Sequence, residues 1–473
     1  MADARIEHFV VLMLENRSFD HIFGYRKGVN GLKGTEFNLL DPSAPQGPTN
    51  PQVKVSNAEP FAILAGEGPS HSFNAVTTQI YGAPKIPDIV TQTNIGFVKS
   101  YRESLNQDHV SNPTSDQIKL VMEAFAPGTL PALEALADNF CLCDRWFCEV
   151  PGPTMPNRMF IHMGSSGGYV HNVWQHEFTD QTIYGLLDAE GKSWATYEFD
   201  QNEVRQFASL KDRTDCFKSF ENDFSRDAAA GSLANYSFII PRFFAKNGPV
   251  NSMHGPYDAR PADQLVADVY NALRSNVETW NKTVLIITMD EHGGFYDHVA
   301  PPPLPAASLD DFSSPPPGDS QSWVPKFNFD RLGLRVPALI VSPWVSAGTV
   351  DSTEYRHTSV LATVIKMFGL TGGLTNRVKT ASTFEALFSE AAARTDAPET
   401  IESGVHIPTP RTFASGTTSD HGDFGLDSMQ HEMVQGVDTL TLPAGRTPLA
   451  LGNHPDTQAA AADFIRERHK RAW

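Results

Sequence analysis

The sequence predicts an α/β fold built on a largely parallel β-sheet. Short, continuous apolar runs recur along the chain, as in strands that are covered by helices on both faces. Amphipathic helical patterns lie between these runs, and such alternation of strand and helix is typical of parallel sheets. A chain of 473 residues has room for one to three domains of this kind.

Four apolar runs predict the interior strands of this sheet. They cover residues 8–14 (HFVVLML), 236–241 (YSFIIP), 283–289 (TVLIITM) and 336–345 (VPALIVSPWV). None of them alternates apolar and polar residues as a half-exposed strand would, so we expect all four to be buried on both faces.

Three segments predict helices, at residues 129–140, 261–280 and 357–370. In the second of them apolar residues recur at every fourth position, at Leu265, Val269, Leu273 and Val277. Pro261 suits the first turn of that helix. Together with the strands, these helices place an α/β domain at residues 1–394.

Two stretches depart from the α/β pattern. Residues 301–317 are too rich in proline for regular structure and predict a surface loop. Residues 395–473 are rich in Thr, Gly, Pro and Asp, which predicts a C-terminal extension without an assigned role.

The charge balance limits the classes of partner. Lys and Arg number 37 and Asp and Glu 55, so the formal net charge is −18. A broad basic surface for nucleic acid is therefore not expected. The four cysteines, Cys141, Cys143, Cys148 and Cys216, lack the paired spacing of a structural zinc site, and we expect buried free thiols.

The apolar runs also bear on membrane insertion and export. None approaches the 18 or more residues of a transmembrane helix. The first run reaches Glu15 before it attains the length of a signal peptide. As it stands, the sequence predicts a soluble cytoplasmic protein, or a secreted or periplasmic one if a leader has been removed.

Polar residues follow two of the predicted strands directly. Glu15 and Asn16 come after the first strand, and Asp290 and Glu291 after the strand at 283–289. Taken singly, each pair could be a helix cap or a turn. The carboxyl ends of neighbouring parallel strands share one crevice. There, three carboxylates would repel one another unless a cation lay among them.

The oxygen ligands of this predicted site favour one hard divalent cation. Ca²⁺, Mg²⁺ or Mn²⁺ fits best, and Zn²⁺ is not excluded. A further candidate is Thr154 in VPGPTMPNRMF, where Pro151, Pro153 and Pro156 stiffen the backbone around one hydroxyl. A plain proline-rich turn would have the same composition.

Four motifs resemble one known family. They are ENRSFDH (15–21), GPTMPNR (152–158), DEHGGFYDHVAPP (290–302) and RVPALIVSPWV (335–345). These segments are similar, in order, to those of the phosphoesterase family that includes bacterial phosphatidylcholine-hydrolysing phospholipases C, plant non-specific phospholipases C and a bacterial acid phosphatase. The resemblance spans residues 6 to about 370.

The resemblance implies an alkaline-phosphatase-like α/β core that cleaves phosphate esters through a phosphorylated hydroxyl. It places the nucleophile on Thr154 and active-site histidines on His71 and His254. The family's metal ligands fall on Glu15, Asn16, Asp290 and Glu291, with the Thr154 oxygen completing the set. A hydroxyl beside a divalent cation is a stronger nucleophile, and histidines are natural proton donors to a departing alkoxide.

For other residues the sequence gives less support for a role in the active site. His357 also suits a helix start, and Asp297 and His298 are interpreted as structural because Gly293-Gly294 lets the chain turn before them. Met155 stands where many family members carry His, and the segment MHGP, residues 253–256, departs from the usual His-Pro pair.

These observations predict a metal-dependent phosphoester hydrolase of the phospholipase C type. It would cleave a phospholipid such as phosphatidylcholine to diacylglycerol and a phosphorylated headgroup through a phospho-threonine intermediate. The alternatives are an acid phosphatase-like phosphomonoesterase and a non-catalytic metal- or lipid-binding relative. Transient contact with a membrane surface would need an apolar element, for which the Phe-rich tracts 217–224 and 241–247 are candidates. Core packing is the more common role for most of these aromatic residues.

Overall fold

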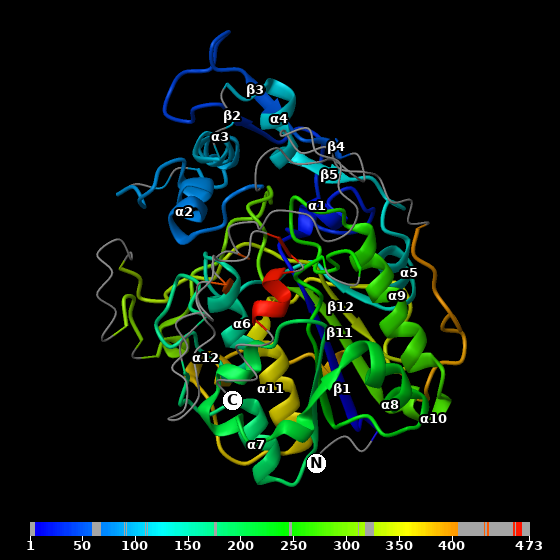
Figure 1. The fold of residues 1–473 in the computed structure, drawn as a ribbon. Coiled ribbons are helices and arrows are strands. Elements are labelled where there is room, and N and C mark those ends of the chain that lie inside the picture. Colours follow the sequence, from blue (N-terminus) through cyan, green and yellow to red (C-terminus); the bar gives the residue numbers. More distant parts are fainter. Residues whose placement is uncertain are drawn as a thin grey trace.

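A computed structural model shows an eight-stranded mixed sheet at the centre of the protein (Figure 1). It describes residues 5–58, 68–88, 90, 92–108, 110, 112–174, 177–245, 248–310, 312–316, 326–404, 430, 433–434, 457–458 and 460–465. In spatial order the strands are β13 (Thr349–Asp351), β6 (Cys141–Cys143), β12 (Ala338–Val341), β11 (Thr283–Met289), β1 (His8–Leu14), β10 (Tyr236–Ile239), β8 (Trp194–Glu198) and β9 (Phe217–Ser219).

The sheet is parallel except at β12. This strand pairs antiparallel with both of its neighbours, β11 and β6, whereas the other pairs are parallel. The expected largely parallel sheet is confirmed, and β12 is the exception within it. All seven residues of β11 and the last six of β1 are buried, because helices cover both faces of the sheet.

Two groups of helices cover the sheet, and Figure 1 shows them on opposite sides of β1 and β11. One group consists of α5 (Pro131–Asn139), α8 (Ser225–Ala229), α9 (Arg260–Arg274) and α10 (Val277–Trp280). The other consists of α6 (Thr154–Met163), α7 (Ile183–Ala189), α11 (His357–Phe368) and α12 (Asn376–Lys379). The predicted helix at 261–280 is thus two helices, and Asn276 caps the second by accepting from Glu278 N and Thr279 N.

A smaller unit lies beyond the carboxyl end of β1, at the top of Figure 1. It follows α1 (Phe19–Phe23) and contains β2 (Phe37–Leu39), β3 (Gln52–Lys54), β4 (Ser56–Ala58), α2 (Phe73–Tyr81), α3 (Phe97–Gln107), α4 (Ser115–Lys119) and β5 (Glu123–Phe125). Its own apolar core includes Phe295 and Tyr296, which belong to the segment after β11. We call residues 37–125 the insertion.

The remaining short elements connect these layers. β7 (Trp146–Phe147) pairs in parallel with β14 (Tyr355–Arg356). Single helical turns cover Leu120–Met122, Glu203–Gln206, Ala208–Leu210, Thr214–Cys216, Phe220–Phe224, Ala306–Ser308 and Glu385–Leu387. All four cysteines are buried free thiols, as predicted.

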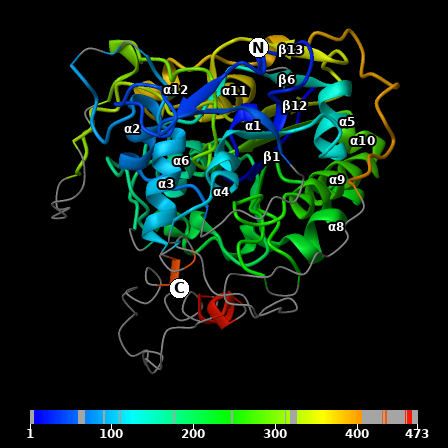
Figure 2. The same cartoon turned by 90° about the horizontal axis from the view of Figure 1, so that it is seen from above.

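Parts of the predicted C-terminal extension pack against the α/β core. Tyr270 of α9 donates from its hydroxyl to Pro398 O over 2.6 Å, and Ile401 N donates to Asn271 Oδ1 over 2.9 Å. Residues 460–465 form a helical segment, which lies at the lower edge of Figure 2 and in front of the sheet in Figure 1. Among the helices in the described ranges, none combines the length and apolarity needed to cross a bilayer.

Candidate active site

The ends of β1 and β11 bring four predicted ligands together. The two strands pair in parallel register from His8 opposite Thr283 to Leu14 opposite Met289, so Glu15 and Asp290 leave the sheet side by side. Asp290 N donates to Leu14 O over 3.1 Å, and Asn16 N lies 3.3 Å from Asp290 Oδ1. Glu15, Asp290 and Glu291 are fully buried.

The backbone at this point is unusually tight. Asn16 has a φ of 61°, a left-handed conformation that is uncommon outside glycine. Gly293, with a φ of 65°, passes so close that a Cβ at this position would lie 2.1 Å from Asn16 O. The glycine after Asp290-Glu291 is therefore what allows the two strand-end loops to approach each other.

Arg158 of α6 forms ion pairs with residues that follow both strands. Its guanidinium donates from Nε to Asp290 Oδ2 over 3.0 Å and from Nη1 to Glu203 Oε1 over 2.9 Å. Its Nη2 lies 3.8 Å from Glu15 Oε1, and the whole side chain is buried. Sequence reasoning missed Arg158 and Glu203, although Arg158 stands in a quoted motif.

Thr154 is the first residue of α6 and is fully buried. It precedes Arg158 by four positions, so the two residues lie on one face of the helix, the spacing that could have identified Arg158. Asn157 braces the preceding turn: its side-chain amide donates to the carbonyls of Val150, Gly152 and Pro153 over 3.0–3.2 Å.

The rings of the two predicted histidines lie next to each other, and His71 also lies close to two of the strand-end residues. His71 Nε2 lies 3.4 Å from Asn16 Nδ2 and 3.9 Å from Glu291 Oε1. The centroids of the His71 and His254 rings are 5.6 Å apart, with the rings nearly perpendicular. His71 comes from the turn before α2 of the insertion, whereas His254 comes from the segment after β10.

Burial dominates the electrostatics of these groups. It raises the pKa of Asp290 to about 7, against the opposing effect of Arg158, and it raises the pKa of Glu291 to about 7, against the effect of His71. Burial also lowers the pKa of His254 to about 4 and lowers the pKa of His71. Clustered carboxylates that are costly to ionise and neutral histidines are typical of a site that receives a cation and an anion.

The donor set fits a hard cation. Asn16 Oδ1 and Glu291 Oε1 are buried and have no hydrogen-bond partner among the residues that the structure describes. Carboxylate and amide oxygens are the ligands that Mg²⁺, Ca²⁺ and Mn²⁺ prefer. A buried oxygen without a hydrogen-bond partner lowers the stability of the fold unless a bound ligand satisfies it.

A second acidic cluster lies farther along the same loops. Asp20, Asp297 and His298 place ligand atoms within 4.8 Å of one another. The Arg335 guanidinium already bridges them, with Nε 2.9 Å from Asp297 Oδ1 and Nη2 2.9 Å from Asp20 Oδ1. These contacts support the structural role predicted for Asp297 and His298, because a buried guanidinium there would repel a cation.

His357, the weaker histidine candidate, supports the backbone of the site. Its Nε2 donates to Asp290 O over 2.7 Å while its Nδ1 accepts from Trp146 Nε1 over 3.3 Å. Both ring nitrogens are therefore engaged in holding the end of β11. His357 begins α11, as its sequence context indicated.

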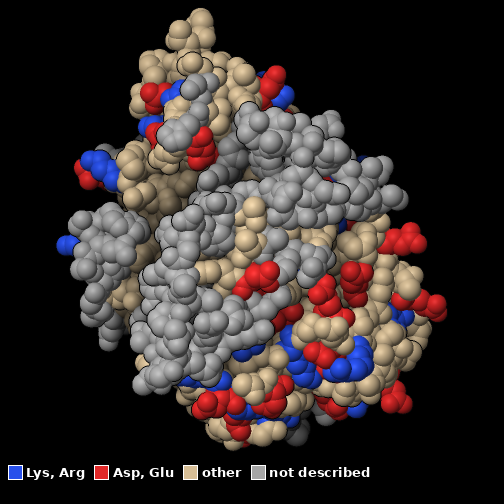
Figure 3. Space-filling model, viewed as in Figure 1, with Lys and Arg blue, Asp and Glu red and all other residues tan. Residues whose placement is uncertain are grey.

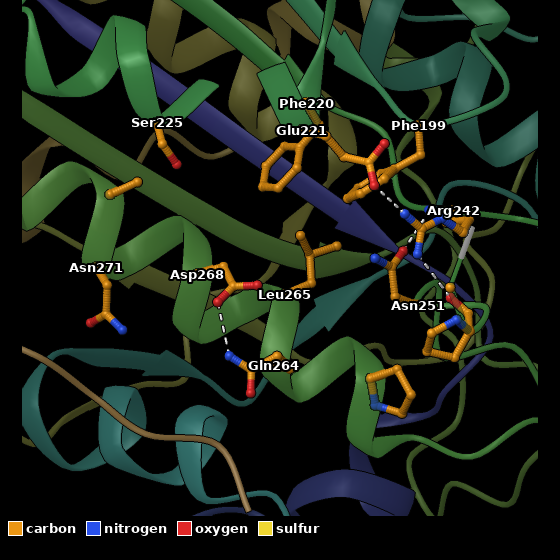
Figure 4. A pocket seen from close by; sticks show the side chains of 14 residues that line it. Phe199, Phe220, Glu221, Ser225, Arg242, Asn251, Gln264, Leu265, Asp268 and Asn271 are labelled. Carbon is orange, nitrogen blue, oxygen red and sulfur yellow. Dashed lines mark hydrogen bonds and ion pairs between the residues drawn. The ribbon is translucent and has the colours of Figure 1, made fainter. Parts of the chain in front are cut away.

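A separate hollow of about 680 Å³ lies beside α9 (Figure 4). Residues such as Leu265 and Asp268 of α9 line one side, and Arg242 and Asn251 line the other. Arg242 donates to Glu221 over 2.7 Å and stacks over the Phe199 ring, so its charge is already compensated. None of the predicted site residues is among those that line this hollow.

Most aromatic rings of the Phe-rich tracts pack in the core, the more common of the two roles considered for them, and do not form an apolar mouth. Phe220, Phe224, Phe243 and Phe244 are buried in the main core. Stacking of Phe220 on Phe224, with centroids 5.2 Å apart, and on the ring of Phe199 explains why these aromatics point inward. Residues 246–247 of the second tract lie outside the described residues.

Comparisons with known proteins agree with the motifs. The model of the Phosphoesterase family matches residues 6–371. Non-specific phospholipase C6 of Arabidopsis thaliana is 35% identical over 453 residues, which cover 91% of this chain and 80% of that protein. Non-hemolytic phospholipase C of Pseudomonas aeruginosa is 28% identical over 457 residues, covering 86% of this chain and 62% of that protein.

Among solved structures, a protein of the alkaline phosphatase superfamily from Vibrio parahaemolyticus matches 73% of this chain and 83% of its own. Its identity is 10% and the TM-score is 0.31. The α/β class of this chain follows from its own sheet and helices.

The family match and the sequence relatives identify a hydrolase that acts on phosphoric ester bonds. The chain belongs to the phosphoesterase family, and it is a phosphoesterase of the phospholipase C type.

Proposed function

We propose that this protein is a metal-dependent phospholipase C that cleaves a phospholipid phosphodiester through a phospho-threonine intermediate. The observation that carries the proposal is the in-register end of β1 and β11, which sets Glu15 and Asn16 beside Asp290 and Glu291. Arg158 links these residues to the helix that begins at Thr154.

Glu15, Asn16, Asp290 and Glu291 would hold one divalent cation together with Thr154 Oγ1. When bound, the cation lowers the pKa of the Thr154 hydroxyl and offsets negative charge on the phosphoryl oxygens. Arg158 favours the charged form of Asp290 and holds this carboxylate in place by a hydrogen bond from a fixed position in α6.

In the first step Thr154 Oγ1 attacks phosphorus, and the bond from phosphorus to the diacylglycerol oxygen breaks. The hydroxyl proton of Thr154 is carried to that departing oxygen by the histidines, with His254 as the final donor. Both histidines are neutral at pH 7 in the free protein because burial lowers the pKa of each. Either can therefore accept a proton before it gives one.

In the second step a water molecule attacks phosphorus and the bond to Thr154 Oγ1 breaks. One proton of that water returns to Thr154, and the phosphorylated headgroup leaves. A bound phosphoryl anion raises the pKa of His71 and His254, so the substrate itself improves the histidines as proton carriers.

Three exposed apolar residues support contact with a lipid surface. Phe37, Ile86 and Val90 are 41–46% exposed, and all three belong to the insertion, which also supplies His71. On the face shown in Figure 3, Lys and Arg gather next to Asp and Glu in the lower part of the view, and some other described areas carry no charge. With a net charge of −18, the chain would favour a zwitterionic surface such as phosphatidylcholine over an anionic one.

Replacement of the nucleophile tests the proposal. We expect Thr154→Ala to abolish phosphoester hydrolysis, whereas Thr154→Ser keeps a hydroxyl and retains measurable turnover. Brief incubation of Thr154→Ser with substrate followed by acid quench and mass spectrometry should give a phosphorylated peptide. The control Thr363→Ala removes a buried hydroxyl in α11 and should keep full activity. Wild-type turnover by Thr154→Ala would refute the nucleophile.

A substrate panel decides between diester and monoester chemistry. Phosphatidylcholine, phosphatidylethanolamine, sphingomyelin and p-nitrophenyl phosphate are assayed side by side with and without a chelator. We expect cation-dependent turnover of the phospholipids and little release from p-nitrophenyl phosphate. The reverse preference would identify a phosphomonoesterase.

A further inference from the structure

Two glutamines of the C-terminal extension are buried against the segment that follows β10. Gln430 and Gln458 are both 0% exposed. Gln430 Nε2 donates to Phe243 O over 2.7 Å, and Gln458 Oε1 accepts from Ala245 N over 2.8 Å. Each glutamine thus binds one backbone group at the start of that segment.

The same two side chains converge on one hydroxyl at the far end of the segment. Tyr257 Oη accepts from Gln458 Nε2 over 2.8 Å and lies 3.3 Å from Gln430 Oε1, to which it donates. The Tyr257 side chain is partly buried, but both glutamines that hold its hydroxyl are fully buried. Breaking either bond would cost a buried amide group one hydrogen bond, so the hydroxyl is restrained. The glutamines therefore fix Phe243 and Ala245, at one end of the segment, relative to Tyr257, at the other.

His254 lies between those fixed ends. Tyr257 N donates to His254 O over 3.0 Å, and the two rings are 6.3 Å apart. The preceding residue, Met253, has a φ of 79°, which a non-glycine residue adopts only when its surroundings hold it there. The conformation that aims His254 at the site thus depends on restraints from outside the segment.

The opposite side of the segment is tied to the strand end of β1. Arg17 donates from Nε to Met253 O over 2.8 Å and from Nη2 to Tyr257 O over 3.4 Å. Glu15 N donates to Ser252 O over 2.7 Å. The segment that carries His254 is therefore held between the proposed metal ligands and the two glutamines.

We propose that Gln430 and Gln458 are positioning residues that hold His254 in place through Tyr257. This inference rests on the proposed role of His254 as proton donor. It gives residues 395–473 a task in the reaction: two glutamines from this extension complete the support of a catalytic histidine in the α/β core.

A double-mutant cycle tests the inference. Tyr257→Phe removes the shared hydroxyl and keeps the ring, and Gln458→Leu removes one amide at similar volume. Each is made in the wild type and in His254→Ala, with kcat and KM measured on a phospholipid in micelles and on a p-nitrophenyl phosphodiester. Ser403→Ala, which breaks a contact of the same extension with Gln264 on α9, is the control.

We expect Tyr257→Phe and Gln458→Leu each to lower kcat on the phospholipid about tenfold, with KM unchanged, since a displaced proton donor forfeits part of its catalytic effect. Turnover of the p-nitrophenyl diester should change little, because p-nitrophenolate leaves without a proton. In His254→Ala neither substitution should cause a further loss, because residues that act through one group are not additive. Ser403→Ala should match the wild type in both assays.

The outcomes separate this inference from the proposed function. Equal losses on both substrates, additive losses in His254→Ala, or wild-type kcat in both variants would each overturn the positioning role. Wild-type kcat on the phospholipid in His254→Ala alone would instead refute His254 as proton donor. Urea unfolding of every variant checks that each one is folded under the conditions of the assay.

Discussion

Arg158 donates from Nε to Asp290 Oδ2 over 3.0 Å, and both side chains are fully buried. The same guanidinium contacts Glu203 and lies 3.8 Å from Glu15. The Arg158 guanidinium thus compensates carboxylates from two strand ends and from the helical turn that begins at Glu203. Because this charge lies inside the protein, its loss should affect both stability and cation binding.

Arg158→Gln should destabilise the protein by ~3–5 kcal/mol, the cost of leaving buried carboxylates without their counter-charge. Titration calorimetry with Mg²⁺ or Ca²⁺ should also show changed affinity, because the ligands lose their alignment. The matched control is Arg205→Gln, which breaks an ion pair with Glu198 in which the side chains are 25% and 24% exposed, and it should cost less than about 1 kcal/mol. Equal unfolding free energies for the two variants would contradict the bridging role.

Gly293 offers a test of the close approach between the strand-end loops. Gly293→Ala places a Cβ 2.1 Å from Asn16 O and also forces a side chain onto a φ of 65°. Gly28→Ala imposes a comparable φ, 85°, but has nothing within 4 Å. The free energy of unfolding of Gly28→Ala should therefore fall only by the conformational cost of the left-handed backbone, about 1–2 kcal/mol.

In urea unfolding, we expect Gly293→Ala to lower the free energy of unfolding clearly more than Gly28→Ala does. Gly293→Ala should also bind the divalent cation more weakly, because Asn16 must move. Cation affinity in Gly28→Ala should equal that of the wild type. If the two alanine variants bound the cation equally well, the Gly293 contact would have no role in shaping the site.

The sequence predicted those elements whose environment is uniform along their length. Strands β1 and β11 match the predicted ranges 8–14 and 283–289 because burial on both faces requires a continuous apolar run. The antiparallel direction of β12 was not predictable, since an apolar run has no direction. Strand β8, Trp194–Glu198, was missed because it contains Thr196 and Glu198.

In the candidate site, too, only residues next to a continuous local pattern could be predicted. That Glu15 and Asn16 lie beside Asp290 and Glu291 could be predicted because each pair directly follows a recognisable strand. Glu203 was missed because it lies 45 residues from Arg158, its partner across the core, and no local pattern indicates that contact. Gln430 and Gln458 were missed for the same reason.

Glu203 should contribute to the pH dependence of stability. Burial alone would raise the pKa of this carboxyl, but Arg158 and His162 lower it to about 2. An unfolded glutamate titrates near pH ~4.3, so folding favours the charged form. The contribution is fully present above about pH 4.3 and is lost as pH falls through about 2.

We expect Glu203→Gln to lower the free energy of unfolding at pH 7 by about 3 kcal/mol and to flatten its decline at acid pH. Urea unfolding at a series of pH values measures both effects. Glu221→Gln is the control, because that glutamate is half exposed although it also pairs with an arginine, Arg242. Parallel curves for Glu203→Gln and the wild type would show that Glu203 is not the titrating group.

The exposed aliphatic residues of the insertion give a test of lipid-surface contact. Ile86 and Val90 are each 46% exposed in the connection between α2 and α3. We expect the double variant Ile86→Asp, Val90→Asp to lose about tenfold in rate on phosphatidylcholine vesicles, because the charged side chains resist transfer from water into the lipid interface. Hydrolysis of a short-chain, monomeric phosphatidylcholine should be unchanged, since that substrate reaches the site from solution.

Val277→Asp is the matched control, because Val277 is 63% exposed but begins α10, on the α/β core rather than on the insertion. It should leave both rates at the wild-type level. A vesicle flotation assay measures the bound fraction directly and should show reduced binding only for the double variant. If Val277→Asp lowered the vesicle rate as much as the double variant, the effect would be one of net charge, and the insertion would not be the surface that meets the lipid.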